Sequence, residues 1–135
     1  MTSYQKGSNV QLSDHFNSNE LDCKCPQCTT TQIDPALITA LEAIRAKTGP
    51  LIITSGYRCQ HHQDELRASG AETATGISQH TIGRAADVTT ADSRLSGVEI
   101  ETIARSVGIR AVGVAKSWAH IDLRDDKDRR WTYND

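Results

Sequence analysis

The feature that most constrains this chain is a histidine and an aspartate seven residues apart in the stretch Ser78–Asp87. A second histidine and aspartate, His120 and Asp122, follow near the C-terminal end. Two imidazoles and one carboxylate are the usual ligands of a zinc ion that keeps one coordination position open for water. Since the two stretches are far apart in sequence, such a site requires a fold that brings them together.

Side-chain alternation along two predicted strands would place these groups on one face. Strands are predicted over 84–90 and 118–123, and successive side chains of a strand point to opposite faces. In the second strand one face is polar and aromatic, with Trp118, His120 and Asp122. Such a face is costly to bury unless its polar groups have partners. Asp87 of the first strand can share a cleft with His120 if the strands are neighbours. Gly83 would allow the sharp turn that brings His80 to the same cleft.

Hydrophobic periodicity predicts an α+β fold, in which a small, mostly antiparallel sheet packs with two main helices. The first helix is predicted over 35–47, where Asp34 caps and Pro35 suits the first turn. The second follows from apolar residues between 98 and 107 and ends at Gly108. The remaining predicted elements are a short buried strand at 51–54, a short polar helix at 59–68, an irregular loop at 71–79, a strand at 111–114 and a turn-like charged tail from 124.

The length of 135 residues predicts one domain, 1–135, with an irregular N-terminal arm over 1–34 that wraps it. Leu12, Phe16 and Leu21 are the expected anchors of this arm. The net charge of -2 argues against nucleic-acid binding, which needs a clustered basic excess. No apolar run is long enough for a membrane span and the start of the chain lacks a signal-peptide pattern, so synthesis in the cytoplasm is expected. A monomeric state is also expected.

Four cysteines leave several interpretations open. Cys23, Cys25 and Cys28 lie close together, and Cys59 stands apart. A structural zinc site prefers two cysteine pairs, each with two residues between its members, and only Cys25 and Cys28 fit. Reduced thiols, or one or two disulfides after export, therefore rank ahead of a second metal. Since three close cysteines cannot all pair among themselves, Cys59 decides between these interpretations.

Arg58 follows Ser55-Gly56-Tyr57 at the end of a predicted strand, where a loop carries functional groups on a rigid support. A guanidinium there can clamp a substrate carboxylate or polarise a peptide carbonyl. The alternative is an ordinary surface ion pair. His61 and His62 lie in the short helix beside the cleft, where substrate contact and solvent exposure are both open, and His15 is expected at the surface.

The motifs Ser-x-His-x-x-Gly-x-Ala-x-Asp at 78–87, Ser-Gly-Tyr-Arg at 55–58 and His-Ile-Asp at 120–122 resemble the M15 peptidases, the zinc D-Ala-D-Ala carboxypeptidase family. The likeness is greatest to the compact branch that includes phage endolysins and murein endopeptidases. Residues 83–90 with 119–121 are also similar to the hedgehog signalling domain, which shares the hedgehog/DD-peptidase fold and its zinc. In that domain the zinc need not imply proteolysis.

The resemblance implies a zinc site and its neighbours, residue by residue. His80, Asp87 and His120 would be the zinc ligands and Arg58 a catalytic and substrate-binding arginine. The other substrate-binding candidates are Ser78, Trp118 and His62. The substrate implied is the peptidoglycan stem peptide, cleaved at an amide bond by a zinc-activated water.

The sequence departs from the family pattern at the general base. Many members carry a carboxylate three residues before the last histidine, and here that position is Ser117. Asp122, on the same strand face as His120, is the predicted substitute. Two alternatives remain: Asp122 could orient His120, or it could be the ligand with His120 as its helper, as the hedgehog pattern suggests.

Two functions follow from these residues. The first is a zinc-dependent peptidoglycan peptidase that acts on the cell wall, either a carboxypeptidase or an endopeptidase, and a phage lytic enzyme is one such protein. The second, motivated by Ser117, is an inactive zinc-stabilised domain that binds the wall or another partner. The bond cleaved is set by cleft shape and not by metal ligands, so the sequence does not identify it.

Overall fold

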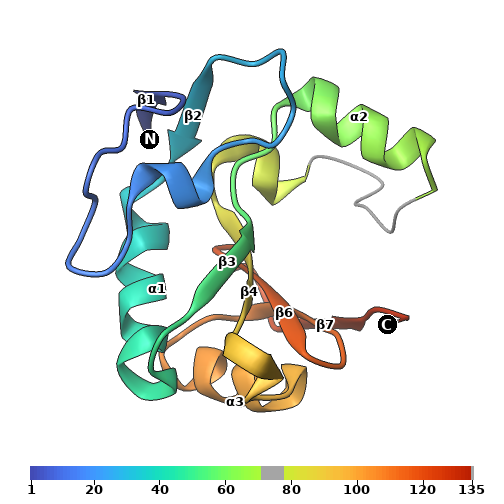
Figure 1. The fold of residues 1–135 in the computed structure, drawn as a ribbon. Helices are drawn as coiled ribbons and strands as arrows, with labels where there is room; N and C mark the ends of the chain where they lie inside the picture. Colours follow the sequence, from blue (N-terminus) through green and yellow to red (C-terminus); the bar gives the residue numbers. More distant parts are fainter. Residues whose placement is uncertain (71–77, 135) are drawn as a thin grey trace.

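The main sheet of the protein has five strands in the order β3-β4-β6-β5-β7 (Figure 1). A computed structural model describes residues 1–70 and 78–134, so most of the loop predicted at 71–79 lies outside the described residues. The strands are β3 Ile52–Ser55, β4 Ala85–Thr89, β5 Ala111–Val114, β6 Trp118–Asp122 and β7 Arg129–Thr132. Neighbouring strands are antiparallel except β5 and β7, which run parallel.

The three α-helices of the described residues begin where the sequence supplies caps. They are α1 Pro35–Thr48, α2 Gln60–Ala68 and α3 Gly97–Ser106, with short 3-10 helices η1 Ser18–Leu21, η2 Gln79–Ile82 and η3 Ala91–Ser93. At α1 the Asp34 side chain accepts a hydrogen bond from the amide of Ala36. At α3 a reciprocal pair, Ser96 and Glu99, satisfies two amides of the first turn. The helices and the mostly antiparallel sheet confirm the predicted α+β class.

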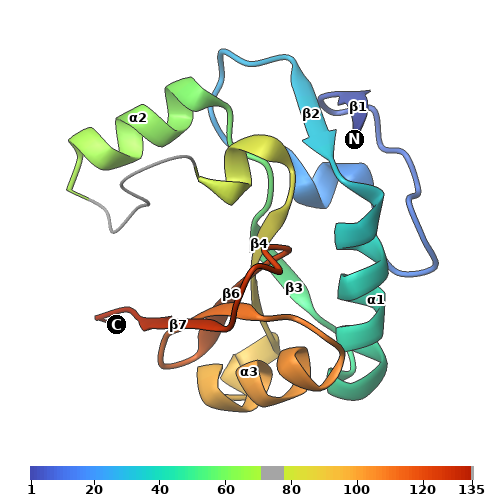
Figure 2. The same ribbon diagram turned by 180° about the vertical axis from the view of Figure 1, so that it is seen from behind.

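The hydrophobic core lies between α1, α3 and one face of the main sheet. Leu41 and Ile44 of α1 and Ile100 of α3 are fully buried in it, together with Val88 of β4 and Ile121 of β6. Figures 1 and 2 place α1 on the opposite side of the molecule from the C-terminal strand β7. The apolar helices therefore cover one face of the sheet and leave the other for polar groups.

The N-terminal arm is more ordered than its polar sequence predicted. Strands β1 Thr2–Gln5 and β2 Thr30–Ile33 pair as a separate two-stranded antiparallel sheet. Phe16 and Leu21 are 1% exposed and anchor the arm, as expected. The prediction of an irregular arm was wrong at its two ends, because the pairing partners lie more than twenty residues apart and no local turn signals them.

Two strand predictions also need correction. The tail from 124 contains β7, which pairs with β5 in parallel, a long-range contact that no hairpin signal announces. The strand β3 was expected to be buried, yet Ile52 is 44% exposed because β3 is the edge strand of the sheet. Within the described residues, the helices are too short or too polar to traverse a bilayer.

Candidate metal centre

Three ligand-type atoms converge on the polar face of the main sheet. His80 Nε2 lies 3.3 Å from Asp87 Oδ1 and 3.2 Å from His120 Nδ1, and the last two atoms are 3.0 Å apart. Ligands at tetrahedral positions around zinc, with bonds of about 2.0–2.1 Å, are separated by about 3.3 Å. The three residues therefore fit a single divalent ion without rearrangement.

The pairing of β4 with β6 places Asp87 directly opposite His120. Ala86 of β4 and Ile121 of β6 point the other way, into the core, and are fully buried. The two strands are therefore neighbours, as predicted, and their polar and apolar side chains lie on opposite faces of the sheet. This part of the site follows from sheet register alone.

His80 is positioned by the short helix η2. Ser78 caps this helix, and its hydroxyl accepts a hydrogen bond from the amide of His80. The ring nitrogen Nδ1 of His80 lies 2.6 Å from the carbonyl oxygen of Gly56, so Nδ1 carries the proton and Nε2 is left as a lone-pair donor. Gly83 ends η2 with φ of 72°, and a Cβ there would lie 2.4 Å from the carbonyl oxygen of Gln32. The glycine is thus required both by the turn and by close packing.

The electrostatics of the cluster favour a cation. Burial lowers the pKa of His80, against the opposing effect of Asp87, so this imidazole is neutral near pH 7. Burial alone would raise the pKa of Asp87, but the two adjacent imidazoles hold the pKa of this carboxyl well below its usual range. A neutral imidazole next to a charged carboxylate is the protonation state that metal binding needs.

Asp122 lies at the other ring nitrogen of His120. Its Oδ2 is 2.8 Å from His120 Nε2, whereas Nδ1 of the same ring faces Asp87. Arg124 donates three further hydrogen bonds to the two oxygens of Asp122. Burial would raise the pKa of Asp122, but the bonds with His120 and Arg124 lower it to about 2. Asp122 is therefore a fully buried, charged group with both oxygens engaged.

His120 responds to these two carboxylates. Burial would lower its pKa, but the hydrogen bonds with Asp122 and Asp87 raise the pKa of His120 above its usual value. The arrangement in which a carboxylate accepts from one imidazole nitrogen while the other faces a metal is common in metalloproteins. It fixes the ring orientation and makes the ligand nitrogen more basic.

Arg58 contacts the cluster through Asp87. Its Nη2 is 3.2 Å from Asp87 Oδ2, its Nε bonds Ser55 Oγ and its Nη1 bonds Gln63 Oε1. The pairing is therefore a buried one with a cluster carboxylate, and not the exposed surface pair weighed as the alternative. The sequence analysis missed Gln63, whose amide nitrogen is buried with no partner in the described part of the chain. Such a donor is costly unless water or a ligand reaches it.

Aromatic residues border the centre on the side of β7. The Trp131 ring lies 5.2 Å from that of His120, centroid to centroid, and its indole donates to the hydroxyl of Tyr133. Trp118 stacks on Tyr133 at 4.7 Å. Trp131 was not predicted to be near the site, since only the unexpected strand β7 brings it there. A strand predicted over 129–132 would have been the one available signal.

The other predicted residues are placed as follows. His62 lies in the first turn of α2, half-buried, where burial and the charge of Arg58 lower its pKa. Ser117 lies in the turn between β5 and β6, and its carbonyl accepts from Thr89. His15 and His61 are largely exposed and bond Glu42 and Glu65.

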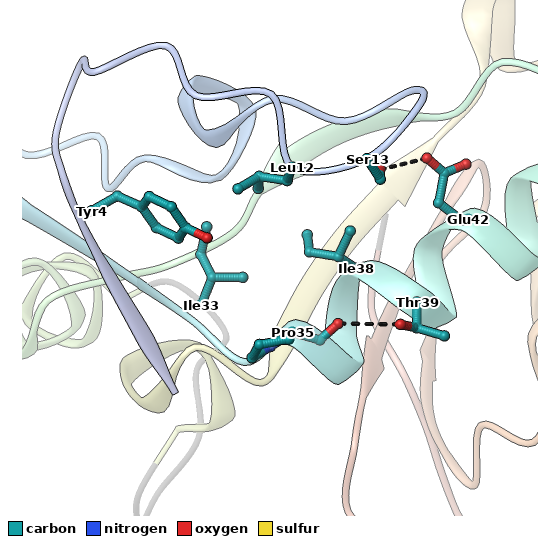
Figure 3. Close-up of a pocket in the computed structure, with 8 residues that line it drawn as sticks. All are labelled: Tyr4, Leu12, Ser13, Ile33, Pro35, Ile38, Thr39 and Glu42. Carbon is teal, nitrogen blue, oxygen red and sulfur yellow. Dashed lines mark hydrogen bonds between the residues drawn. The ribbon is translucent and has the colours of Figure 1, made fainter.

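A separate pocket of about 410 Å³ lies between the N-terminal arm and α1 (Figure 3). Leu12 and Ile38 face each other across it, and Ser13 donates to Glu42 at its rim. Its lining residues are Tyr4, Leu12, Ser13, Ile33, Pro35, Ile38, Thr39 and Glu42. None belongs to the metal cluster. The pocket lies where the N-terminal arm packs on α1.

The fold and the centre together define a class: an α+β protein with a candidate site for a catalytic divalent metal. A protein-family model matches most of the chain. The model described as Peptidase M15 matches residues 14–123, and the chain belongs to this family. Its members are peptidases and are generally zinc-dependent. No curated protein and no solved structure gave a significant match.

Proposed function

We propose that the protein is a zinc-dependent peptidase whose metal is held by His80, Asp87 and His120. The observation that carries this is the mutual spacing of 3.0–3.3 Å between the three ligand atoms, inside a buried cluster in which His80 is neutral and Asp87 is charged near pH 7. The orientation of the rings supports His120, and not Asp122, as the third ligand, because His120 Nδ1 faces the cluster and Asp122 meets the opposite nitrogen.

Zinc held there would polarise the scissile carbonyl and lower the pKa of a bound water to about 7. Arg58 anchors the Asp87 carboxylate, and three of the five N–H donors of its guanidinium bond Ser55, Gln63 and Asp87. The remaining two can bind a substrate carboxylate or carbonyl. Ser78 holds η2 in place, and Trp118 and His62 are proposed to contact the substrate from the β6 and α2 sides.

The proposed substrate is the stem peptide of peptidoglycan, which the family motifs favour. Incubating the zinc-loaded protein with defined muropeptides should release new amino groups, and mass spectrometry of the products would identify the bond. Chelation should remove the activity and added zinc should restore it. Zinc bound at this cluster with no cleavage of any stem peptide would instead support the second function, an inactive wall-binding domain, which the serine at 117 motivates.

For Asp122 we propose that it orients His120, since both oxygens are engaged and neither faces the cluster. Asp122→Asn should lower zinc affinity and activity by about 10–100-fold. It should also lower the pKa of His120 in the metal-free protein, because the charge that raises it is gone. Zinc binding needs unprotonated Nδ1, so in the wild type it is lost as pH falls through the raised pKa of His120; in the variant this loss moves to lower pH. Imidazole NMR titration and zinc competition measure both effects.

The matched control is Asp128→Asn, since Asp128 also pairs with an arginine, Arg110, but its side chain is 78% exposed. Asp128→Asn should change neither the zinc affinity nor the pKa of His120. A general-base role for Asp122 gives a different pattern: kcat would fall while zinc affinity stayed at the wild-type value. That pattern would contradict the positioning role and restore the base assignment.

A further inference from the structure

The four cysteines, which the catalytic proposal does not use, form a second cluster with metal-site geometry. The sulfur atoms of Cys23, Cys25, Cys28 and Cys59 all lie within 4.8 Å of one another. Cys25 Sγ is 3.3 Å and Cys23 Sγ is 3.7 Å from Cys59 Sγ. Four thiolates around a zinc ion at about 2.3 Å are about 3.8 Å apart. The cluster is therefore slightly irregular but close to a tetrahedral sulfur shell.

Hydrogen-bond donors lie next to three of the four sulfur atoms. Amide groups of Cys59 and His62 donate to Cys23 Sγ and Cys59 Sγ, each at 3.4 Å. The ammonium of Lys6 is 3.5 Å from Cys28 Sγ and also contacts the carbonyl of Cys25. Charge-assisted donors of this kind stabilise negative sulfur, and a shell of four thiolates around a divalent ion carries a net charge of about -2 that a nearby ammonium offsets.

The number of protein ligands separates this cluster from a catalytic site. Cys23 and Cys25 are 2% exposed, and Tyr57 packs against them. Four protein ligands fill the four positions that zinc takes in structural sites, so no position remains for water or substrate. Cysteine sulfur also selects zinc and other soft ions over magnesium or calcium.

We propose that Cys23, Cys25, Cys28 and Cys59 bind a structural zinc ion that joins the N-terminal arm to the loop carrying Arg58. Three ligands come from the arm, and Cys59 is the N-cap of α2, directly after Arg58. The same loop contacts the arm through a hydrogen bond from the Tyr57 amide to the Leu21 carbonyl. Its Gly56 carbonyl holds His80. The ion would therefore fix the loop that supports the proposed catalytic centre.

Disulfides fit this geometry less well. A disulfide needs two sulfur atoms at about 2.05 Å, whereas the Sγ atoms of Cys25 and Cys23 lie 3.3 and 3.7 Å from that of Cys59. Cys59 lies near both Cys23 and Cys25, so no single pair is singled out by distance. A radial arrangement of four sulfurs around a common point is what one central ion requires, whereas two bridges would draw the atoms into separate pairs.

The test uses the full chain, purified with zinc and without thiol oxidants, and counts zinc by elemental analysis. Wild type should hold about two zinc ions per chain. His80→Ala should keep about one, and the double variant Cys25→Ser/Cys28→Ser should also keep about one. In the cobalt-substituted protein, the strong sulfur-to-cobalt charge-transfer absorption should persist in His80→Ala and disappear in the cysteine variant.

A wild-type experiment covers the case in which the cysteine variant does not fold. A thiol-specific mercurial should release about one zinc per chain in step with thiol modification, in wild type and His80→Ala alike. An intact mass lowered by the hydrogens lost on disulfide formation, or four thiols that react with no zinc release, would overturn the proposal. Because His80→Ala retains the sulfur-bound ion, failure of this inference is distinguishable from failure of the proposed peptidase.

Discussion

His80→Ala should remove zinc from the His80, Asp87 and His120 cluster and lower peptidase activity by at least about 10³-fold. The variant deletes one of three ligands whose ligand atoms lie 3.0–3.3 Å apart, and it leaves two neighbours that cannot define a tetrahedral site. A metal supplies several kcal/mol of charge stabilisation in the transition state. Since each 1.36 kcal/mol is a factor of ten in rate, losing about 4 kcal/mol gives about a thousandfold.

The measurement is amide cleavage of a defined muropeptide, together with zinc content. The matched control is His15→Ala, the same change at a histidine whose side chain is 43% exposed and which pairs with Glu42. An exposed pair of this kind contributes at most about 1 kcal/mol to stability, so the control should remain folded and active. Wild-type activity in His80→Ala, with the control behaving as expected, would exclude this cluster as the catalytic centre.

The parts of the site that the sequence predicted are those governed by local rules. Alternation placed Asp87 and His120 on one face, and sheet register then made them direct partners. The helix over 35–47 followed from its cap and from apolar spacing, and the structure extends it by one residue to Thr48. A sharp turn was predicted at Gly83, and the positive φ of this residue makes that turn.

The parts that were missed depend on contacts between distant segments. The bond from Arg58 to Asp87 and the packing of Trp131 on His120 each join elements more than ten residues apart, and no sequence period reports them. Cysteine spacing made a second metal the less favoured interpretation. The approach of Cys59 to the other three, on which the proposed second metal depends, arises only because α2 begins beside the arm.

The two clusters share one loop, which couples their proposed roles. Between Gly56 and Cys59 the chain bonds His80, packs Tyr57 on the cysteines and aims Arg58 at Asp87. A cation on each side of this loop would fix it at both ends. Rigid support of this kind is what keeps metal ligands and substrate-binding groups in register.

Gly83→Ala should destabilise the protein by about 2–4 kcal/mol and disturb the placement of His80. Its φ of 72° costs a residue with a side chain about 1 kcal/mol. The added Cβ would lie 2.4 Å from the carbonyl oxygen of Gln32, which is backbone and cannot rotate away. Either η2 or β2 must therefore shift, and η2 carries the zinc-facing imidazole.

Chemical denaturation gives the change in the free energy of unfolding, and zinc competition reports the site. The matched control is Gly7→Ala, because Gly7 has φ of 79° but nothing within 4 Å of an added Cβ. It isolates the backbone cost, so its destabilisation should be only about 1 kcal/mol. Equal losses in the two variants would show that the contact with Gln32 relaxes freely, and the close approach would then not be what places His80. A larger loss in Gly83→Ala, accompanied by weaker zinc binding, follows if the turn at Gly83 sets the position of the ligand.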